Sequence, residues 1–363
     1  MLKKMLLCFC LFAYMLGVSA GTDGVVEDNK KGDVAVKNLT RAMTLLDNTI
    51  DKCFKGSDLH MCDLYHLGNG RQEGTADVWP YTAAMEAVNG VMEALQTLKG
   101  NCPELYAKNM ERYKCLMARL FDNLDYYKGT YTLTSYTQTK EWSVYGVHRS
   151  NTKGTAKVEG IENVYDDQMW LVRELVRAYR NTGEKRYLVE AEYLADYVID
   201  GWDCTLDADG HENGGITWGP GYNSKHSCSN APIISPLVWL SQIYKDCKDK
   251  AVWRYVAADG KRKSKKISKH DLYLMFAEKV YEWQKRKLMN EKTGCYWDML
   301  GADGKMRYEN VGGKRYRANV PNGGPVGTEF TYNSGTMLCG AADLLQVTGS
   351  NVYRTDLTQL AKA

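Results

Sequence analysis

Apolar residues recur at three- and four-residue spacing along most of the chain, which is the pattern of amphipathic helices. Regular alternation of apolar and polar residues, which would indicate β-strands, is almost absent. The pattern therefore predicts an all-α protein. The predicted helices cover residues 34–56, 79–99, 103–127, 164–182, 185–202, 231–248, 270–290 and 329–348, and another begins at about 350.

The connections between these helices alternate in length. Short turns such as 181–183 (Asn-Thr-Gly) join some pairs, whereas the long segments 128–163, 203–230 and 291–328 separate others. This rhythm is typical of helical hairpins that stack side by side and place their long loops on one face. We expect a binding cleft on that face. The Lys- and Arg-rich segment 261–266 is predicted to be a solvated loop.

Composition excludes several classes of function. The chain has 363 residues, of which 44% are hydrophobic and 25% are charged, as in an ordinary globular protein. Its formal net charge of +3 is small for this length, so overall charge indicates neither a nucleic-acid partner nor an acidic membrane surface. No segment after the first 20 residues is apolar for long enough to span a bilayer. We expect a monomer.

The N-terminus has the pattern of a signal peptide over residues 1–20, with two lysines, an apolar run and small residues before Gly21. We expect export to a periplasm or the medium and a single domain over residues 21–363. In an oxidising compartment Cys53 could pair with Cys62, and Cys204 with Cys228. The sequence has neither a CxxC pair nor an HExxH motif, so no metal site is expected.

Residues 165–170 (Tyr-Asp-Asp-Gln-Met-Trp) place two adjacent carboxylates at the start of a predicted helix. Aspartate is also favoured in a first helical turn as a cap, but one aspartate suffices for that. Repulsion between neighbouring carboxylates separates their pKa values, and a glycosidase needs one carboxylate and one carboxylic acid. Asp166 and Asp167 are therefore predicted to be catalytic.

Three further clusters contain residues that suit a sugar-binding cleft. The loop 214–230 combines Gly215, Trp218 and Asn230, the segment 330–335 begins another helix with Tyr332 and Asn333, and Trp79 opens the second helix. The first cluster could also be a turn followed by a helix cap, the second a helix cap, and Trp79 could face the core. The 9 Trp and 25 Tyr, against 6 Phe, favour aromatics that have both an apolar face and a polar edge.

Taken together and in this order, residues 165–170, 214–230 and 330–335 resemble the motifs of glycoside hydrolase family 76, the endo-α-1,6-mannanases. The resemblance runs from about Asp33 to the C-terminus and implies an (α/α)6 barrel of six helical hairpins. The family has twelve helices and the pattern here predicts about nine. We therefore expect a fragment that lacks the last hairpin and a half.

The resemblance also implies the chemistry. Asp166 would attack the anomeric carbon of α-mannan, and Asp167 would protonate the leaving oxygen, with no cofactor. The expected substrate contacts are stacking on Trp170 and Trp218, hydrogen bonds from Asn230, Tyr332 and Asn333, and further contacts from Gly215 and Trp79. The alternatives are another (α/α)6 enzyme, such as a hydrolase of unsaturated glucuronyl oligosaccharides, and a glycan-binding protein without activity.

Overall fold

The computed structural model describes residues 24–363, so the predicted signal peptide lies outside the described residues. Within this range every predicted helix is present, and most helix ends agree to within a few residues. The sixth helix is shorter than predicted, because a 3-10 turn over Ala231–Ile233 precedes it. The helices are α1 (Gly24–Cys53), α2 (Val78–Thr97), α3 (Pro103–Leu124), α4 (Tyr165–Thr182), α5 (Lys185–Asp200), α6 (Ile234–Ile243), α7 (Lys269–Leu288), α8 (Thr331–Thr348) and α9 (Asn351–Leu360).

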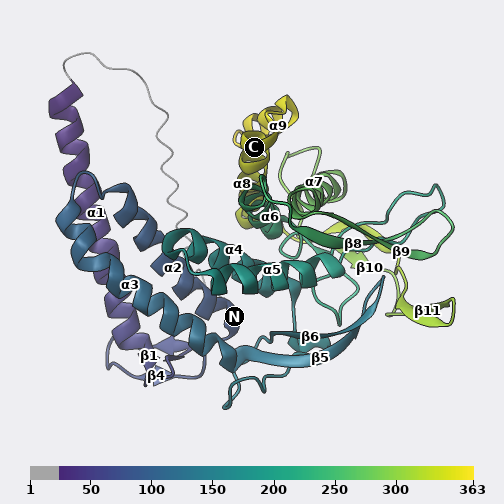
Figure 1. The fold of residues 1–363 in the computed structure, drawn as a ribbon, viewed down its shortest axis with the longest axis horizontal. Coiled ribbons are helices and arrows are strands. Elements are labelled where there is room, and N and C mark those ends of the chain that lie inside the picture. The colour runs from purple at the N-terminus through teal and green to yellow at the C-terminus, as the bar shows by residue number, and fades with distance from the viewer. Residues whose placement is uncertain (1–23) are drawn as a thin grey trace.

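Consecutive helices form the predicted hairpins: α2 packs on α3, α4 on α5, α6 on α7 and α8 on α9. The first members of these hairpins also contact one another in succession, from α2 through α4 and α6 to α8. Their partners flank this series, with α4 and α5 central in Figure 1. The result is an arc of inner helices. Helix α6 is buried almost all round, as an inner position requires.

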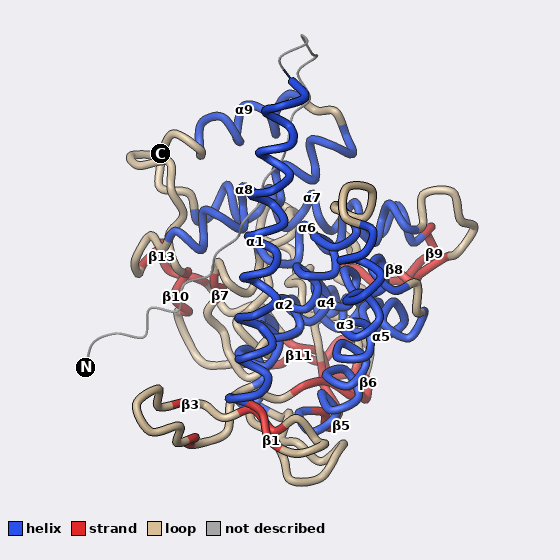
Figure 2. Tube along the Cα trace, turned by 90° about the vertical axis from the view of Figure 1, so that its left-hand side faces the viewer, coloured by secondary structure: helices blue, strands red, loops and turns tan. Residues whose placement is uncertain are grey.

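The long connections contain β-hairpins, so the prediction of an all-α protein is correct only for the dominant structure (Figure 2). The longer hairpins are β5 (Lys128–Thr134) with β6 (Thr139–Tyr145), β8 (Lys250–Val256) with β9 (Arg262–Ser268), and β11 (Tyr308–Val311) with β12 (Lys314–Arg317); β13 (Asn322–Val326), β10 (Met299–Ala302) and β7 (Lys225–His226) form a three-stranded sheet. Two short ladders, β1 (Phe54–Lys55) with β2 (His60–Met61) and β3 (Leu64–Tyr65) with β4 (Gln72–Glu73), follow α1.

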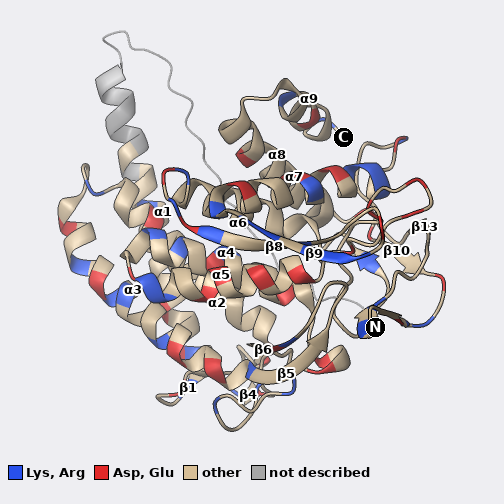
Figure 3. Cartoon of the chain, turned by 45° about the vertical axis from the view of Figure 1, so that its right-hand side comes forward, with Lys and Arg blue, Asp and Glu red and all other residues tan. Residues whose placement is uncertain are grey.

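The charged segment 261–266 illustrates why these strands have little sequence signal. It was predicted to be a loop, but residues 262–266 belong to β9, where most side chains are exposed. A strand without a buried face lacks alternation of apolar and polar residues. The pairing of β9 with β8 appears only in the three-dimensional structure. There Lys265 lies opposite Trp253, with its Nζ 4.4 Å from the indole ring centre. Elsewhere on the surface both signs of charge are interspersed (Figure 3).

The abundance of tyrosine is largely a property of the core. Buried tyrosines direct their hydroxyl groups to partners inside the protein, as Tyr145 does to Glu190 at 2.7 Å. The tyrosines with almost no exposed surface are Tyr81, Tyr113, Tyr127, Tyr145, Tyr165, Tyr187, Tyr197, Tyr273 and Tyr281. The excess of tyrosine over phenylalanine is therefore weak evidence for a sugar-binding cleft.

Neither predicted disulfide is present, because no disulfide bond joins any of the nine cysteines in the described residues. Cys53 and Cys62 are neighbours across the short ladder after α1, where the Cys62 N–H donates to the Cys53 carbonyl at 2.9 Å. Cys204 and Cys228 have different charged neighbours, Glu212 near Cys204 and Asp166 near Cys228. Among the described residues, no helix combines the length and apolar character that a membrane span needs.

Candidate active site

The loop before α6 anchors the start of α4. Val164, in extended conformation, precedes the helix and provides no side-chain cap. The free N–H of Tyr165 instead donates to the Trp218 carbonyl at 2.8 Å. Gly219 makes this approach possible, since a Cβ there would lie 2.3 Å from the Asn163 carbonyl oxygen. Two segments about fifty residues apart in sequence are thereby joined at the first turn of α4.

The two aspartates of this first turn make different contacts. Asp166 accepts a hydrogen bond at 3.1 Å from the backbone N–H of Asp167. The Asp167 side chain is only 6% exposed, and within residues 24–363 its carboxyl group makes neither a hydrogen bond nor an ion pair. Capping therefore accounts for at most one of the two carboxyl groups.

Their environments also give them different acidities. Burial raises the pKa of Asp166 to about 6, against the opposing effects of the Cys228 thiol and the Trp218 indole N–H. Burial raises the pKa of Asp167 well above its usual range, and the charges of Asp166 and then Asp77 raise it further. Asp167 thus carries an additional rise in pKa from the charge of Asp166, and pKa values pushed apart in this way suit an acid beside a nucleophile.

Aromatic side chains from three elements surround the pair. Trp170 lies one turn further along α4 and donates from its indole N–H to the Tyr332 hydroxyl at 3.2 Å, which joins α4 to the start of α8. Trp218 stacks on His226, with 5.0 Å between ring centres and 22° between planes. The Trp218 indole nitrogen is buried and has no hydrogen-bond partner of standard geometry within the described residues. The structure therefore places Trp170, Trp218 and Tyr332 near the acid pair, and their contacts with substrate stay a prediction.

Two neighbours of the acid pair were not predicted as site residues. Cys228 was considered only for a disulfide, but its thiol lies beside Asp166, and burial raises its pKa well above the usual range. Asp77 precedes α2, and its Oδ1 atom lies 2.7 Å from Nδ1 of His148. Trp79, two residues on, is 41% exposed at the start of α2. The only sequence signal for Asp77 was its position two residues before Trp79.

Three other predicted contacts serve the protein itself. Gly215 has φ of 78°, and a Cβ there would lie 2.3 Å from the Trp283 ring, so the close approach is to an indole. Asn230 is fully buried, and its amide accepts from Ile216 N–H at 2.8 Å and donates to the Ile216 carbonyl at 2.9 Å. Asn333 is 1% exposed and donates to the Tyr296 carbonyl at 3.3 Å. The predicted sugar contacts of Gly215, Asn230 and Asn333 do not fit these positions.

One group of side chains in the described residues could hold a metal ion. Ligand atoms of Asp207, Asp209 and His211 lie within 4.8 Å of one another, and all three side chains are exposed. They belong to the loop after α5 and are not part of the acid pair. Hydrolysis by two carboxyl groups and water needs no metal.

Comparison with known proteins places this arrangement in context. A family model described as Glycosyl hydrolase family 76 matches residues 81–250 and 265–363. No curated protein sequence matches the chain. The structure is similar to a family 76 glycoside hydrolase from a bovine Bacteroides thetaiotaomicron strain, with a TM-score of 0.59 and 20% identity over 89% of this chain and 56% of that one.

Two further solved structures share the fold. The family 76 mannosidase of Bacteroides thetaiotaomicron VPI-5482 has a TM-score of 0.56 and 20% identity over 89% of this chain and 70% of that one. An α-1,6-mannanase of Salegentibacter sp. HEL1_6 has a TM-score of 0.53 and 21% identity over 91% of this chain and 69% of that one. The latter is an inactive variant, in which two consecutive aspartates are replaced by asparagine, in complex with α-1,6-mannotriose. The chain thus spans little more than half of the first of these structures.

Proposed function

Because the chain belongs to glycosyl hydrolase family 76, we propose that it cleaves α-1,6-mannosidic bonds within mannan backbones with retention of configuration. The observation that carries this proposal is the pair of adjacent carboxyl groups of Asp166 and Asp167 in the first turn of α4, of which Asp167 is buried. The inactivity of the Salegentibacter mannanase without its two consecutive aspartates supports the assignment.

The reaction has two steps. In the first, an Asp166 carboxylate oxygen attacks the anomeric carbon while Asp167 donates its proton to the glycosidic oxygen; the bond to that oxygen breaks and the shortened chain leaves as an alcohol. In the second, Asp167, now a carboxylate, removes a proton from water, whose oxygen attacks the anomeric carbon and releases Asp166. Each step inverts the configuration at this carbon, so the two together retain it.

The surrounding side chains suit a mannan chain. Trp218 and Trp170 border the pair with aromatic surface, and the Tyr332 hydroxyl offers a hydrogen bond to a sugar hydroxyl. The exposed Trp79 provides a further aromatic surface at the start of α2.

We propose that the arc from α2 to α8 corresponds to inner helices of an (α/α)6 toroid. Export and a monomeric state stay predictions.

Digestion of unbranched α-1,6-mannan tests the proposal, with the products resolved by size. The parent protein should release short oligosaccharides, and Asp166→Asn should lower the rate by about a thousandfold or more. Asp209→Asn, an exposed aspartate outside the site, is the matched control and should keep full activity. A folded parent that binds mannan without releasing product would support the glycan-binding alternative. Cleavage of unsaturated glucuronyl oligosaccharides alone would support the other enzyme.

A further inference from the structure

Tyr222 is a third neighbour of the acid pair that was not predicted as a site residue. It lies in the loop before β7, and its ring contacts the Trp218 ring, with 4.7 Å between ring centres and 47° between planes. Trp218 is the residue whose indole N–H lowers the pKa of Asp166. Burial, and then the charge of Asp166, raise the pKa of the Tyr222 hydroxyl. The ring contact and the charge both place Tyr222 next to the proposed nucleophile.

The Tyr222 hydroxyl is available to a ligand. The residue is half-buried, and within residues 24–363 its hydroxyl oxygen makes no hydrogen bond. The described buried atoms without a partner do not include this oxygen, so solvent reaches it. A hydroxyl group in this state can donate to a sugar hydroxyl or accept from one without giving up a contact inside the protein.

The backbone around Tyr222 is packed closely against the segment before α4. The Tyr222 N–H donates to the Gly219 carbonyl at 3.0 Å, which closes a tight turn. Gly221 lies inside this turn, and a Cβ there would lie 2.4 Å from the carbonyl carbon of Gly160. The turn therefore has no room to shift toward α4.

A buried arginine holds the other side of the turn. Arg317, on β12, is 4% exposed. Its guanidinium group donates to the Pro220 carbonyl, at 3.0 Å, and to the Tyr222 carbonyl. It also donates to Asn223 Oδ1 at 3.3 Å, and it forms no ion pair within the described residues. A buried charge without a counter-ion is costly, so these three acceptors of the turn are what stabilise it.

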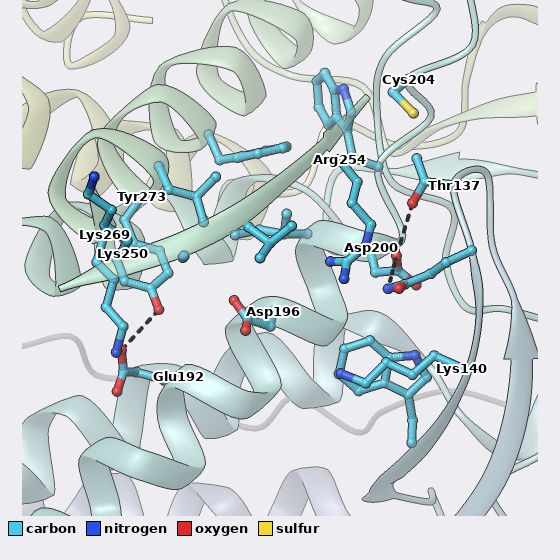
Figure 4. Close-up of a pocket in the computed structure, with 18 residues that line it drawn as sticks. Thr137, Lys140, Glu192, Asp196, Asp200, Cys204, Lys250, Arg254, Lys269 and Tyr273 are labelled. Atoms are coloured by element: carbon cyan, nitrogen blue, oxygen red, sulfur yellow. Dashed lines mark hydrogen bonds and ion pairs between the residues drawn. The ribbon is translucent and has the colours of Figure 1, made fainter. Parts of the chain in front are cut away.

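The tip of the β5–β6 hairpin holds Arg317 in turn. The Arg317 backbone N–H donates to the Ser135 carbonyl at 2.9 Å. Helix α5 fixes this tip, because Thr137 and Gln138 donate to Asp200 Oδ1 at 3.4 and 2.9 Å (Figure 4). A series of direct contacts thus runs from α5 to the turn before β7.

We propose that Tyr222 is a substrate-contacting residue, whose hydroxyl group hydrogen-bonds a hydroxyl of the sugar unit bound beside Asp166, and that Arg317 positions it. The inference rests on the proposed function, because it takes an α-mannoside as the ligand. The turn is fixed before the ligand arrives, so little entropy is lost when the hydrogen bond forms. A fixed polar group also discriminates between sugars, because a sugar without the matching hydroxyl leaves it unpaired.

Calorimetric titration with α-1,6-mannotetraose tests the contact. The protein used carries Asp166→Asn and Asp167→Asn, so that the ligand is not consumed. Addition of Tyr222→Phe removes one oxygen and keeps the ring on Trp218, and it should raise Kd about tenfold. An unchanged Kd would overturn the inference.

Tyr255→Phe is the matched control for this titration. Tyr255 is also half-buried, and its ring lies 4.8 Å from the ring centre of Trp253. Its hydroxyl makes no hydrogen bond in the described part of the chain, but it lies on β8, away from the acid pair. Tyr255→Phe should therefore leave Kd unchanged. An equal rise in Kd for both variants would also contradict the inference.

The role of Arg317 is tested in the chain with an intact acid pair. Arg317→Lys keeps the charge but loses the planar group that reaches several acceptors, and should lower kcat/KM for α-1,6-mannotetraose about tenfold. In a chain that already carries Tyr222→Phe, the same change should lower kcat/KM by less than about threefold, because its effect passes through the Tyr222 hydroxyl. Equal losses in the two backgrounds would show a structural role only. Arg317→Gln takes its place if Arg317→Lys does not fold.

Failure of this inference differs from failure of the proposed function. If the parent neither binds nor cleaves α-1,6-mannan, the proposed function fails and the inference fails with it. If the parent cleaves mannan and Tyr222→Phe matches it in both Kd and kcat/KM, the inference alone fails.

Discussion

Asp166 and Asp167 are chemically identical neighbours whose surroundings differ. Asp166 receives a backbone N–H and lies beside the Cys228 thiol and the Trp218 indole, whereas Asp167 is buried without such partners. Hydrogen bonds to a carboxylate lower its pKa, and burial together with a neighbouring negative charge raises it. The proposed division of roles between nucleophile and acid therefore depends on contacts with other segments of the chain.

The pH dependence of the reaction should show both groups. We expect a bell-shaped profile of kcat/KM, with an acidic limb near pH 6 where Asp166 becomes protonated. The alkaline limb should lie at higher pH than the acidic limb and should reflect loss of the Asp167 proton. Measurement of residual activity in Asp167→Asn should show the acidic limb alone. A profile of the variant that keeps the alkaline limb would assign the acid to another residue.

Stability should depend on pH through the same pair. A carboxyl group with a raised pKa in the folded state binds its proton more tightly than in the unfolded chain. The resulting stabilisation is complete below about pH 4 and is lost as the pH rises through the folded pKa of about 6. Asp166→Asn should therefore exceed the parent in unfolding free energy by about 1–3 kcal/mol at pH 7.5, and by nearly nothing at pH 4. Urea unfolding at both pH values checks this, with Asp209→Asn expected to match the parent.

At the scale of elements, the glycine-rich loop is held by contacts to a helix far along the chain. Gly214 and Gly215 both have positive φ and lie against Trp283 on α7, whose indole N–H donates to the Asn213 carbonyl at 3.1 Å. The same loop carries Trp218, which meets the start of α4. The loop therefore positions an aromatic at the acid pair because α7 holds its glycine turn.

Substitution of Gly215 should disturb this loop. Gly215→Ala would place Cβ 2.3 Å from the Trp283 ring and strain a residue at φ of 78°, with an expected loss of about 2–4 kcal/mol in unfolding free energy. Gly210→Ala is the control, since Gly210 has φ of 82° but no atom within 4 Å of the added Cβ. It should cost only about 1–2 kcal/mol. Equal losses in the two variants would show that the packing against Trp283 does not matter.

At the scale of the whole molecule, helices supply the continuous core and hairpins are placed on its surface. The core cluster runs from Leu39 on α1 to Tyr353 on α9 and is built mainly from helical residues. Most side chains of the β8–β9 hairpin are at least partly exposed. The hairpin packs on α7 and is not part of the inner series from α2 to α8.

Removal of this hairpin should leave the scaffold intact. Replacement of residues 252–266 by an Asn-Gly turn would join Ala251 and Ile267, which are partners across the ladder. We expect a melting temperature within about 5 °C of the parent and unchanged kcat on α-1,6-mannotetraose. Loss of cooperative unfolding would instead show that the hairpin is needed for the fold.

The sequence by itself determined the positions of the helices, their pairing into hairpins and the two consecutive aspartates at the start of α4. These features depend on residues close together in the chain, through helical periodicity and loop length. The tertiary structure alone decided which residues surround the acid pair and why Gly215, Asn230 and Asn333 face the protein. Cys228, Asp77 and Trp283 reach their partners from distant segments, and a strand such as β9, without a buried face, has no periodic signal to reveal it.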